Sequence, residues 1–134
     1  ELLAALRNVD LFRALSDGQL KQLIGVLAEH VYTSGKWVFR PGELGDQFFI
    51  VTSGEAEVLR SEEHERGKTR LAHLSQWSSF GERALLHKQK RFAGVRATSK
   101  VLKCLAVDKP TFEAALGPLS MLLPKQKYDR TSGE

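Results

Sequence analysis

The segment "SSFGERALLHKQKRFAGVRA", residues 78–97, holds the side chains whose types and spacing suggest chemistry. Glu82 follows a glycine near one end, and Arg91 precedes small residues near the other. A short helical turn that starts at Glu82 would point unpaired backbone N–H groups at an anion. Arg91 would add a planar guanidinium that suits phosphate oxygens, and the Glu82 carboxylate would accept hydrogen bonds from sugar hydroxyls. These residues predict a site for a sugar phosphate.

A purely structural interpretation of the same segment is also open. "FGERALL" is consistent with a capped turn, across which Glu82 and Arg91 pair as ions. In the functional interpretation, Phe80 anchors the turn in the core, and Ala93 and Gly94 are small enough for a ligand to lie against the strand. Spacing alone does not separate the two interpretations.

The hydrophobic pattern around this segment predicts helices, then short strands, then helices again. Residues 1–30 are expected to be helical, with a capping box at Ser16 and Gln19. Residues 31–107 show closely spaced strand patterns separated by Gly and Pro turns, with Leu71 and Leu74 as inward positions and a charged hairpin tip at residues 62–68. This order predicts an antiparallel sandwich or barrel behind a helical lead-in.

The C-terminal part returns to a helical pattern. Asp108 is a good N-cap, Pro110 is tolerated in the first turn, and an apolar stripe runs to Gly117. A second helical piece is expected over residues 118–123, and Pro124 should end or kink it. Residues 124–134 are polar and are expected to form a frayed tail.

Composition narrows the class of protein. The chain has 134 residues, which suits one domain, and a net charge of +4 without a clustered basic face, which disfavours nucleic-acid binding. Cys104 is the single cysteine, so no intrachain disulfide can form, and no run approaches the length of a membrane span. Because the sequence starts at Glu1 without a cationic stretch, we expect no signal peptide and a position inside a longer protein.

Other kinds of site are disfavoured. "RGKT" at residues 66–69 resembles the end of a phosphate-binding P-loop, but Glu62 stands where that loop needs glycine. The four histidines are too scattered to form a metal site with Cys104, which also argues against a metal-dependent enzyme of the cupin type. Nothing after Leu119 resembles a helix-turn-helix, as a bacterial transcription factor would require.

"FGERALL…RFAGVRA" resembles the phosphate-binding cassette of the cyclic nucleotide-binding domains of cAMP- and cGMP-dependent protein kinases. That pattern is Phe-Gly-Glu-x-Ala-Leu, a short spacer, and Arg followed by small residues. The flanking sequences "VDLFRALSDGQLKQL" and "KCLAVDKPTFEAALGPL" are similar to the family too, so the resemblance runs from Val9 to Leu119. An upstream framework also matches the family: Gly35, Gly42, Gly45, Asp46, Phe48, Ile50 and Gly54.

The resemblance implies an α+β, mainly β fold: an antiparallel β-roll, or jelly-roll sandwich, with an N-terminal helical bundle and C-terminal helices. The single domain would comprise a helical lead-in (1–30), the roll (31–107, cassette at 80–92), C-terminal helices (108–123) and a tail (124–134). Glu82 would hold the ribose 2′-hydroxyl and Arg91 the cyclic phosphate, while backbone N–H groups of Ala84 and Phe92, with Gly81, would complete the cradle. The implied binding residues are Phe80, Gly81, Glu82, Arg83, Ala84, Arg91, Phe92 and Ala93, with no catalytic residue and no metal.

Three residues depart from the family pattern. Phe92 replaces the Ala of cAMP sites or the Thr of cGMP sites, so its ring would stack on the base or crowd it. Gly94 is expected to loosen a strand position, and Trp77 replaces a common glycine before the cassette. The sequence keeps the phosphate and ribose residues and lacks the usual marker of base selectivity.

The leading hypothesis is therefore a cyclic nucleotide-binding regulatory module of a cyclic-nucleotide-dependent protein kinase. Arg83 after the cassette glutamate resembles the cGMP kinases, whereas "LGPLSMLL" resembles the end of a cAMP-kinase regulatory subunit; cGMP is slightly favoured. The alternatives are that cAMP-kinase subunit and a degenerate module that binds no nucleotide. The resemblance further implies a kinase catalytic domain in cis or in trans, neighbouring cyclic nucleotide-binding domains and a cytoplasmic location. Tyr128 is the candidate residue to cap the base, beyond Pro124.

Overall fold

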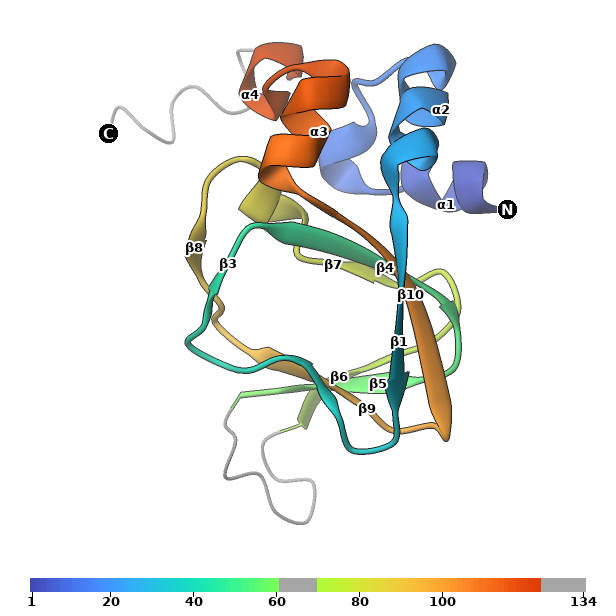
Figure 1. Cartoon of the computed structure of the whole chain (residues 1–134), viewed down its shortest axis with the longest axis vertical. Coiled ribbons are helices and arrows are strands. Elements are labelled where there is room, and N and C mark those ends of the chain that lie inside the picture. Colours follow the sequence, from blue (N-terminus) through green and yellow to red (C-terminus); the bar gives the residue numbers. More distant parts are fainter. Residues whose placement is uncertain (61–69, 124–134) are drawn as a thin grey trace.

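The structure, a computed structural model, describes residues 1–60 and 70–123. Helical segments gather at one end of a β-roll, as Figure 1 shows. Those before the roll are α1 (Leu2–Arg7), a 3₁₀ turn η1 (Asp10–Phe12) and α2 (Asp17–Val26), and those after it are α3 (Lys109–Leu116) and α4 (Leu119–Leu122). A further 3₁₀ turn, η2 (Glu82–Leu85), interrupts the strands at the cassette.

The strands of the described residues pair antiparallel in two four-stranded sheets and a two-stranded ribbon. One sheet has the order β1-β10-β4-β7, the other β2-β9-β5-β6, and the ribbon is β3-β8. Their bounds are β1 Ala28–Thr33, β2 Trp37–Phe39, β3 Leu44–Gly45, β4 Gln47–Ser53, β5 Ala56–Leu59, β6 Arg70–Leu74, β7 Ser79–Phe80, β8 Gln89–Lys90, β9 Gly94–Ala97 and β10 Val101–Asp108. The jelly-roll fold predicted from the sequence is confirmed.

Strand β4 is buried on both faces and separates two hydrophobic cores. Phe48 and Ile50 face the helices, and Phe49 and Val51 alternate with them to face the interior of the roll. In the helical core Phe12 lies between two other rings, with centroids 5.0 Å from Phe48 and 6.1 Å from Phe112. The helices are therefore packed onto the back of the strand that contacts the cassette turn η2.

The predicted helix ends are confirmed at both ends of the roll. The Ser16 hydroxyl accepts from the Gln19 N–H at 3.1 Å, and the Gln19 side chain accepts from the Ser16 N–H at 2.8 Å. The Asp108 carboxylate accepts from the Thr111 N–H at 2.8 Å, and hydrogen bonds with the side chain and then the N–H of Thr111 lower the pKa of Asp108. The helical lead-in is shorter than expected, because α2 ends at Val26 and β1 begins at Ala28.

One inward position was predicted wrongly, and two predictions lie outside the described residues. Leu71 is 41% exposed, because it lies three residues from Leu74, and side chains an odd number of positions apart on a strand point to opposite faces of the sheet. Leu74 packs against the core inside the roll, as predicted. The hairpin tip at residues 62–68 and the tail at 124–134 are not described.

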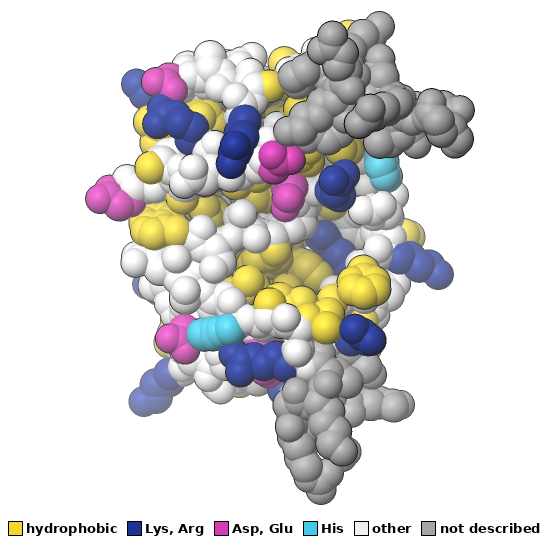
Figure 2. All heavy atoms as spheres, turned by 180° about the vertical axis from the view of Figure 1, so that it is seen from behind, with side chains coloured by type: hydrophobic (Ala, Val, Ile, Leu, Met, Phe, Trp, Pro, Cys, Tyr) yellow, Lys and Arg dark blue, Asp and Glu magenta, His cyan; other side chains and the backbone are white. Residues whose placement is uncertain are grey.

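The surface mixes apolar and cationic groups. On the face opposite to that of Figure 1, hydrophobic side chains gather in the middle, and lysine and arginine side chains lie around them (Figure 2). Among the described residues, no helix is long and apolar enough to cross a membrane. Within the same ranges, no three His, Cys, Asp or Glu side chains gather as a metal site would require.

Candidate functional site

The cassette begins with a glycine that the backbone requires. Gly81 has φ +84°, in the left-handed region, and a Cβ there would lie 2.6 Å from the carbonyl oxygen of Gln47. It precedes η2, whose first hydrogen bond is from the Ala84 N–H to the Gly81 oxygen at 3.1 Å. The N–H groups of Glu82 and Arg83 precede this first hydrogen bond. They lie at the N-terminal end of η2, where unpaired N–H groups favour an anion.

The apolar residues of η2 fix this turn to the protein core. Ala84 and Leu85 are buried, and Leu85 belongs to the same core cluster as Phe112 of α3 and Leu119 of α4. Phe80, expected to anchor the turn, stacks on Phe49 with ring centroids 5.1 Å apart. The cassette backbone is thus fixed to both cores of the molecule.

The backbone of Arg91 is held by the turn that follows β2. Its N–H donates to the Glu43 oxygen at 2.8 Å, and its oxygen accepts from the Gly42 N–H at 2.8 Å. Gly42 has φ +86°, so the Pro41-Gly42 turn predicted from the sequence is confirmed. Both hydrogen bonds fix Arg91 against a segment almost fifty residues earlier in the chain.

The side chain of Arg91 is enclosed as well. Its Nη2 donates to the Gln47 oxygen at 2.9 Å, and the guanidinium carbon lies 4.0 Å from the centroid of the Phe39 ring. Gly45 lies on another side of it: a Cβ at that position would come within 2.6 Å of Nη2. The alternative from the sequence, an ion pair with Glu82, is not formed between these two described residues.

One donor of this guanidinium is unsatisfied. Arg91 Nε is buried and has no hydrogen-bond partner. Burial lowers the pKa of Arg91, while the carboxylates of Asp46 and Glu43 act in the opposite direction and favour the charged form. A half-buried, charged and incompletely paired guanidinium fits an anionic ligand, because an anion would satisfy donors that the protein leaves open.

Two cavities meet at Arg91 and Phe39, which line both of them. The larger has a volume of about 320 Å³ and is lined by Phe39, Gly81, Arg83, Ala84, Gln89, Lys90, Arg91, Phe92 and Ala93. The smaller has a volume of about 140 Å³ and is lined by Val38, Phe39, Glu43, Leu44, Gly45, Asp46, Gln47, Phe49 and Arg91.

The structure gathers most of the predicted binding residues around the larger cavity. Gly81, Arg83, Ala84, Arg91, Phe92 and Ala93 line it. Phe80 lies behind it in the stack with Phe49, and Glu82 is half-buried on η2 but is not part of either lining. The roles assigned to these residues stay predictions, including the ribose contact of Glu82.

The sequence did not predict the residues that surround the Arg91 guanidinium. Phe39, Gln47 and Gly45 hold the guanidinium, yet only Gly45 was noted, and only as part of a glycine framework. The pair Gly45-Asp46 directly before a buried strand was the available signal. Nothing in the sequence indicates that Phe39 would lie under Arg91, because that contact joins strands far apart in the chain.

Two of the departures from the family pattern have a structural explanation. Gly94 is buried in β9, and a Cβ there would lie 2.6 Å from Pro41 Cδ and 2.7 Å from Trp37 Cζ3, so the position needs a residue without a side chain. The space beside it is filled by β2 and the following turn, so it is not available to a ligand. Trp77, where the family has glycine, adopts φ +72°, the one left-handed φ of a non-glycine residue among the described positions.

Comparisons with known proteins identify the family of the chain. A family model described as "Cyclic nucleotide-binding domain" matches residues 29–117. The chain is 32% identical over 122 residues to the cGMP-dependent protein kinase egl-4 of Caenorhabditis elegans, covering 91% of this chain and 16% of that protein. It is 34% identical over 134 residues to the cAMP-dependent protein kinase regulatory subunit of Blastocladiella emersonii, covering 98% of this chain and 32% of that protein.

Solved structures have the same fold. The cAMP-bound structure of PfPKA-R matches with a TM-score of 0.76 and 25% identity, covering 96% of this chain and 45% of that one. The N-terminal domain of a transcriptional regulator from Streptomyces coelicolor matches with a TM-score of 0.75 and 25% identity, covering 96% and 93%. The chain spans a third or less of the length of the kinase proteins named above. With the family model matching more than half of its residues, the chain belongs to the cyclic nucleotide-binding domain family.

Proposed function

We propose that this chain is the regulatory switch of a cyclic-nucleotide-dependent protein kinase, with a slight preference for cGMP over cAMP. The observation that carries the binding step is Arg91, whose guanidinium is partly buried, fixed in place and left with a buried Nε that has no hydrogen-bond partner. A cyclic phosphate carries one negative charge and accepts the remaining donors of this group and the N–H groups at the start of η2. Glu82 accepts from the ribose 2′-hydroxyl.

The preference for cGMP is supported by Arg83. This side chain is exposed and lines the same cavity as Arg91. A guanidinium donates well to O6 and N7 of guanine, whereas adenine presents an amino donor in place of O6. The preference stays slight, because Phe92 stands where the family places the hydroxyl that favours guanine.

The switch itself is supported by the packing of η2. Leu85 joins the cassette to Phe112 of α3 and Leu119 of α4 in one core. A ligand that binds one arrangement of this core more tightly than another shifts the positions of the C-terminal helices. In this proposal that shift releases a kinase catalytic domain, held in cis or in trans and accompanied by further cyclic nucleotide-binding domains, in the cytoplasm.

Calorimetric titration with cAMP and cGMP tests the proposal. We expect both nucleotides to bind, with dissociation constants within tenfold of each other and the lower one for cGMP. Hydrogen exchange should show added protection on ligand binding at residues 80–93 and also at 112–123. Failure of both nucleotides to bind at high micromolar concentration would favour the degenerate module, and protection confined to 80–93 would contradict the switch.

A further inference from the structure

Phe92 differs from every other phenylalanine of the chain. Its side chain is 79% exposed, whereas Phe12, Phe48, Phe49 and Phe112 are at most 2% exposed. The other six of the seven phenylalanines each pack against another ring, but no ring of the described residues contacts Phe92. A large apolar ring left in water adds little to folding, and the place of this ring beside Arg91 is what gives its exposure a meaning.

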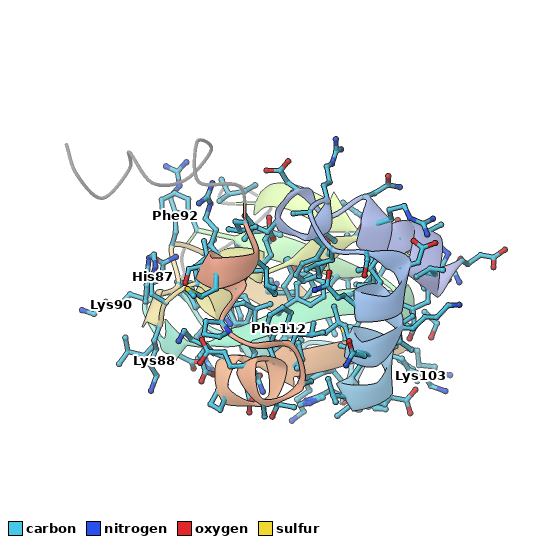
Figure 3. All side chains as sticks on the ribbon, turned by 90° about the horizontal axis from the view of Figure 1, so that it is seen from above. His87, Lys88, Lys90, Phe92, Lys103 and Phe112 are labelled. Atoms are coloured by element: carbon cyan, nitrogen blue, oxygen red, sulfur yellow. The ribbon has the colours of Figure 1, made fainter. Side chains whose placement is uncertain are left out.

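The ring stands at the mouth of the binding cavity. Phe92 directly follows Arg91 and lines the cavity of about 320 Å³. Figure 3 shows His87, Lys88, Lys90 and Phe92 on the same edge of the molecule, while Phe112 lies among the helices and strands. The other aromatic ring of this lining, Phe39, already carries the guanidinium of Arg91 on its face. Phe92 is therefore the ring of this lining whose surface is open.

We propose that Phe92 is the stacking platform for the purine base and that it accepts adenine and guanine alike. This inference rests on the proposed function. A phosphate held by Arg91 places the sugar and then the base within the same cavity, and the phenyl ring offers a planar apolar face to a planar heterocycle. The ring has no donor or acceptor, so it reads the shape of a base and not its edge.

The strength expected of this contact is that of base–aromatic stacking. Removal of a stacking ring weakens binding by about 5- to 100-fold. Because both purines present similar faces, Phe92→Ala should weaken cAMP and cGMP by nearly equal factors. A ligand with the cyclic phosphate and ribose but a methoxy group in place of the base should bind the two proteins equally.

The experiment is calorimetry on the wild type, Phe92→Ala, Phe92→Leu and Phe92→Trp with cAMP, cGMP and methyl riboside 3′,5′-cyclic phosphate. We expect Trp to retain the affinity for both nucleotides, Leu to lose part of it, and Ala to lose most. Val31→Ala is the matched control, because Val31 on β1 is 55% exposed and lies outside both cavity linings and outside the segment expected to respond to ligand. Thermal unfolding of all variants should stay within a few degrees of the wild type, as expected for exposed side chains.

A second measurement does not depend on weak binding of the base-free ligand. The tryptophan emission of Phe92→Trp, corrected for the wild-type signal of Trp37 and Trp77, should be quenched by both nucleotides. Absence of nucleotide binding by the wild type would overturn the proposed function and this inference with it. Wild-type binding with unchanged affinity in Phe92→Ala would overturn the inference alone, and so would an equal loss for the base-free ligand. In that case Phe92 would be free to serve as a contact for a protein partner.

Discussion

Arg91 and Phe92 are neighbours in the chain, but they occupy opposite kinds of environment. Arg91 is fixed by two backbone hydrogen bonds, by the Gln47 oxygen and by the Phe39 ring. Phe92 is 79% exposed and has no ring contact among the described residues. The side of the site that would bind phosphate is organised before any ligand arrives, whereas the side that would bind the base is open.

Because Arg91 is ordered and Phe92 is exposed, we expect the phosphate side of the site to supply affinity and the base side to determine specificity. A preorganised guanidinium loses little freedom when it binds an anion, so the phosphate contact can supply most of the affinity. An open apolar ring favours any planar base and discriminates weakly.

Gly45→Ala should have the largest effect on ligand binding. The new methyl group would overlap the guanidinium of Arg91, a movable side-chain end, while the φ of Gly45 is not in the left-handed region. Arg91 should therefore leave its place at little cost to folding, and affinity for cAMP and cGMP should fall by about 3 kcal/mol, or roughly 100-fold. Calorimetry and thermal unfolding on the same samples measure the two quantities.

Gly25→Ala is the matched control for this change. Gly25 lies in α2, and a Cβ there meets nothing within 4 Å. This substitution should leave the affinity unchanged and stabilise the helix by about 0.5–1 kcal/mol. Wild-type affinity in Gly45→Ala would show that the observed position of the guanidinium is not the one that binds ligand.

Arg91→Lys tests the planar group itself. Lysine keeps the charge but cannot donate to Gln47 and to a ligand through one rigid fork, nor present a flat group to Phe39. We expect cyclic nucleotide binding to weaken by about 1–3 kcal/mol. Arg13→Lys, an exposed change of the same type outside both cavity linings, should have no effect. Equal affinities in the wild type and Arg91→Lys would show that Arg91 contributes only its positive charge and not the geometry of its guanidinium.

Glu82→Gln should have a smaller and ligand-dependent effect. The carboxylate is expected to accept a hydrogen bond from the ribose 2′-hydroxyl, worth about 1 kcal/mol or somewhat more. The substitution should weaken cAMP and cGMP but hardly change the affinity of their 2′-deoxy analogues, so the two losses should not add. Additive losses would place Glu82 away from the ribose, as its absence from both cavity linings would then suggest.

The sequence predicted the local features of this molecule better than the contacts between distant segments. The capping box at Ser16, the N-cap at Asp108 and the short helical turn at Glu82 depend on neighbours along the chain, and all three are confirmed. The contact of Phe39 with Arg91 depends on how the roll closes, and no local pattern encodes it. Leu71 failed for a different reason: it lies three positions from Leu74, so one regular strand cannot turn both side chains inward, and the structure keeps Leu74 on the inner face.

Gly94 and Trp77, which depart from the family pattern, also depend on contacts with distant segments that the sequence alone does not reveal. A glycine in a strand suggested looseness, but here it makes room for Trp37 and Pro41 from another strand and its turn. A tryptophan in place of a family glycine gave no structural expectation from the sequence alone. The structure shows that this position keeps the backbone of a glycine, with φ +72°, while its side chain packs against the helical core.

The smallest effect is expected from a comparison of Trp77→Gly with Trp77→Ala. Both remove the indole from its packing against the helical core, so both should lower the free energy of unfolding. Only glycine relieves the left-handed backbone, by about 1–2 kcal/mol, but it also adds about 0.4–1 kcal/mol of entropy to the unfolded chain. Trp77→Gly should therefore be more stable than Trp77→Ala by about 0.5–1 kcal/mol in denaturant unfolding. Ligand affinity should be similar in the two variants, because Trp77 lines neither cavity. If Ala were the more stable of the two, residue 77 would not hold a left-handed backbone in solution, and the hydrogen bonds of 2.8 Å that join Trp77 N–H and Ser78 O to Val51 would have to form with a different turn.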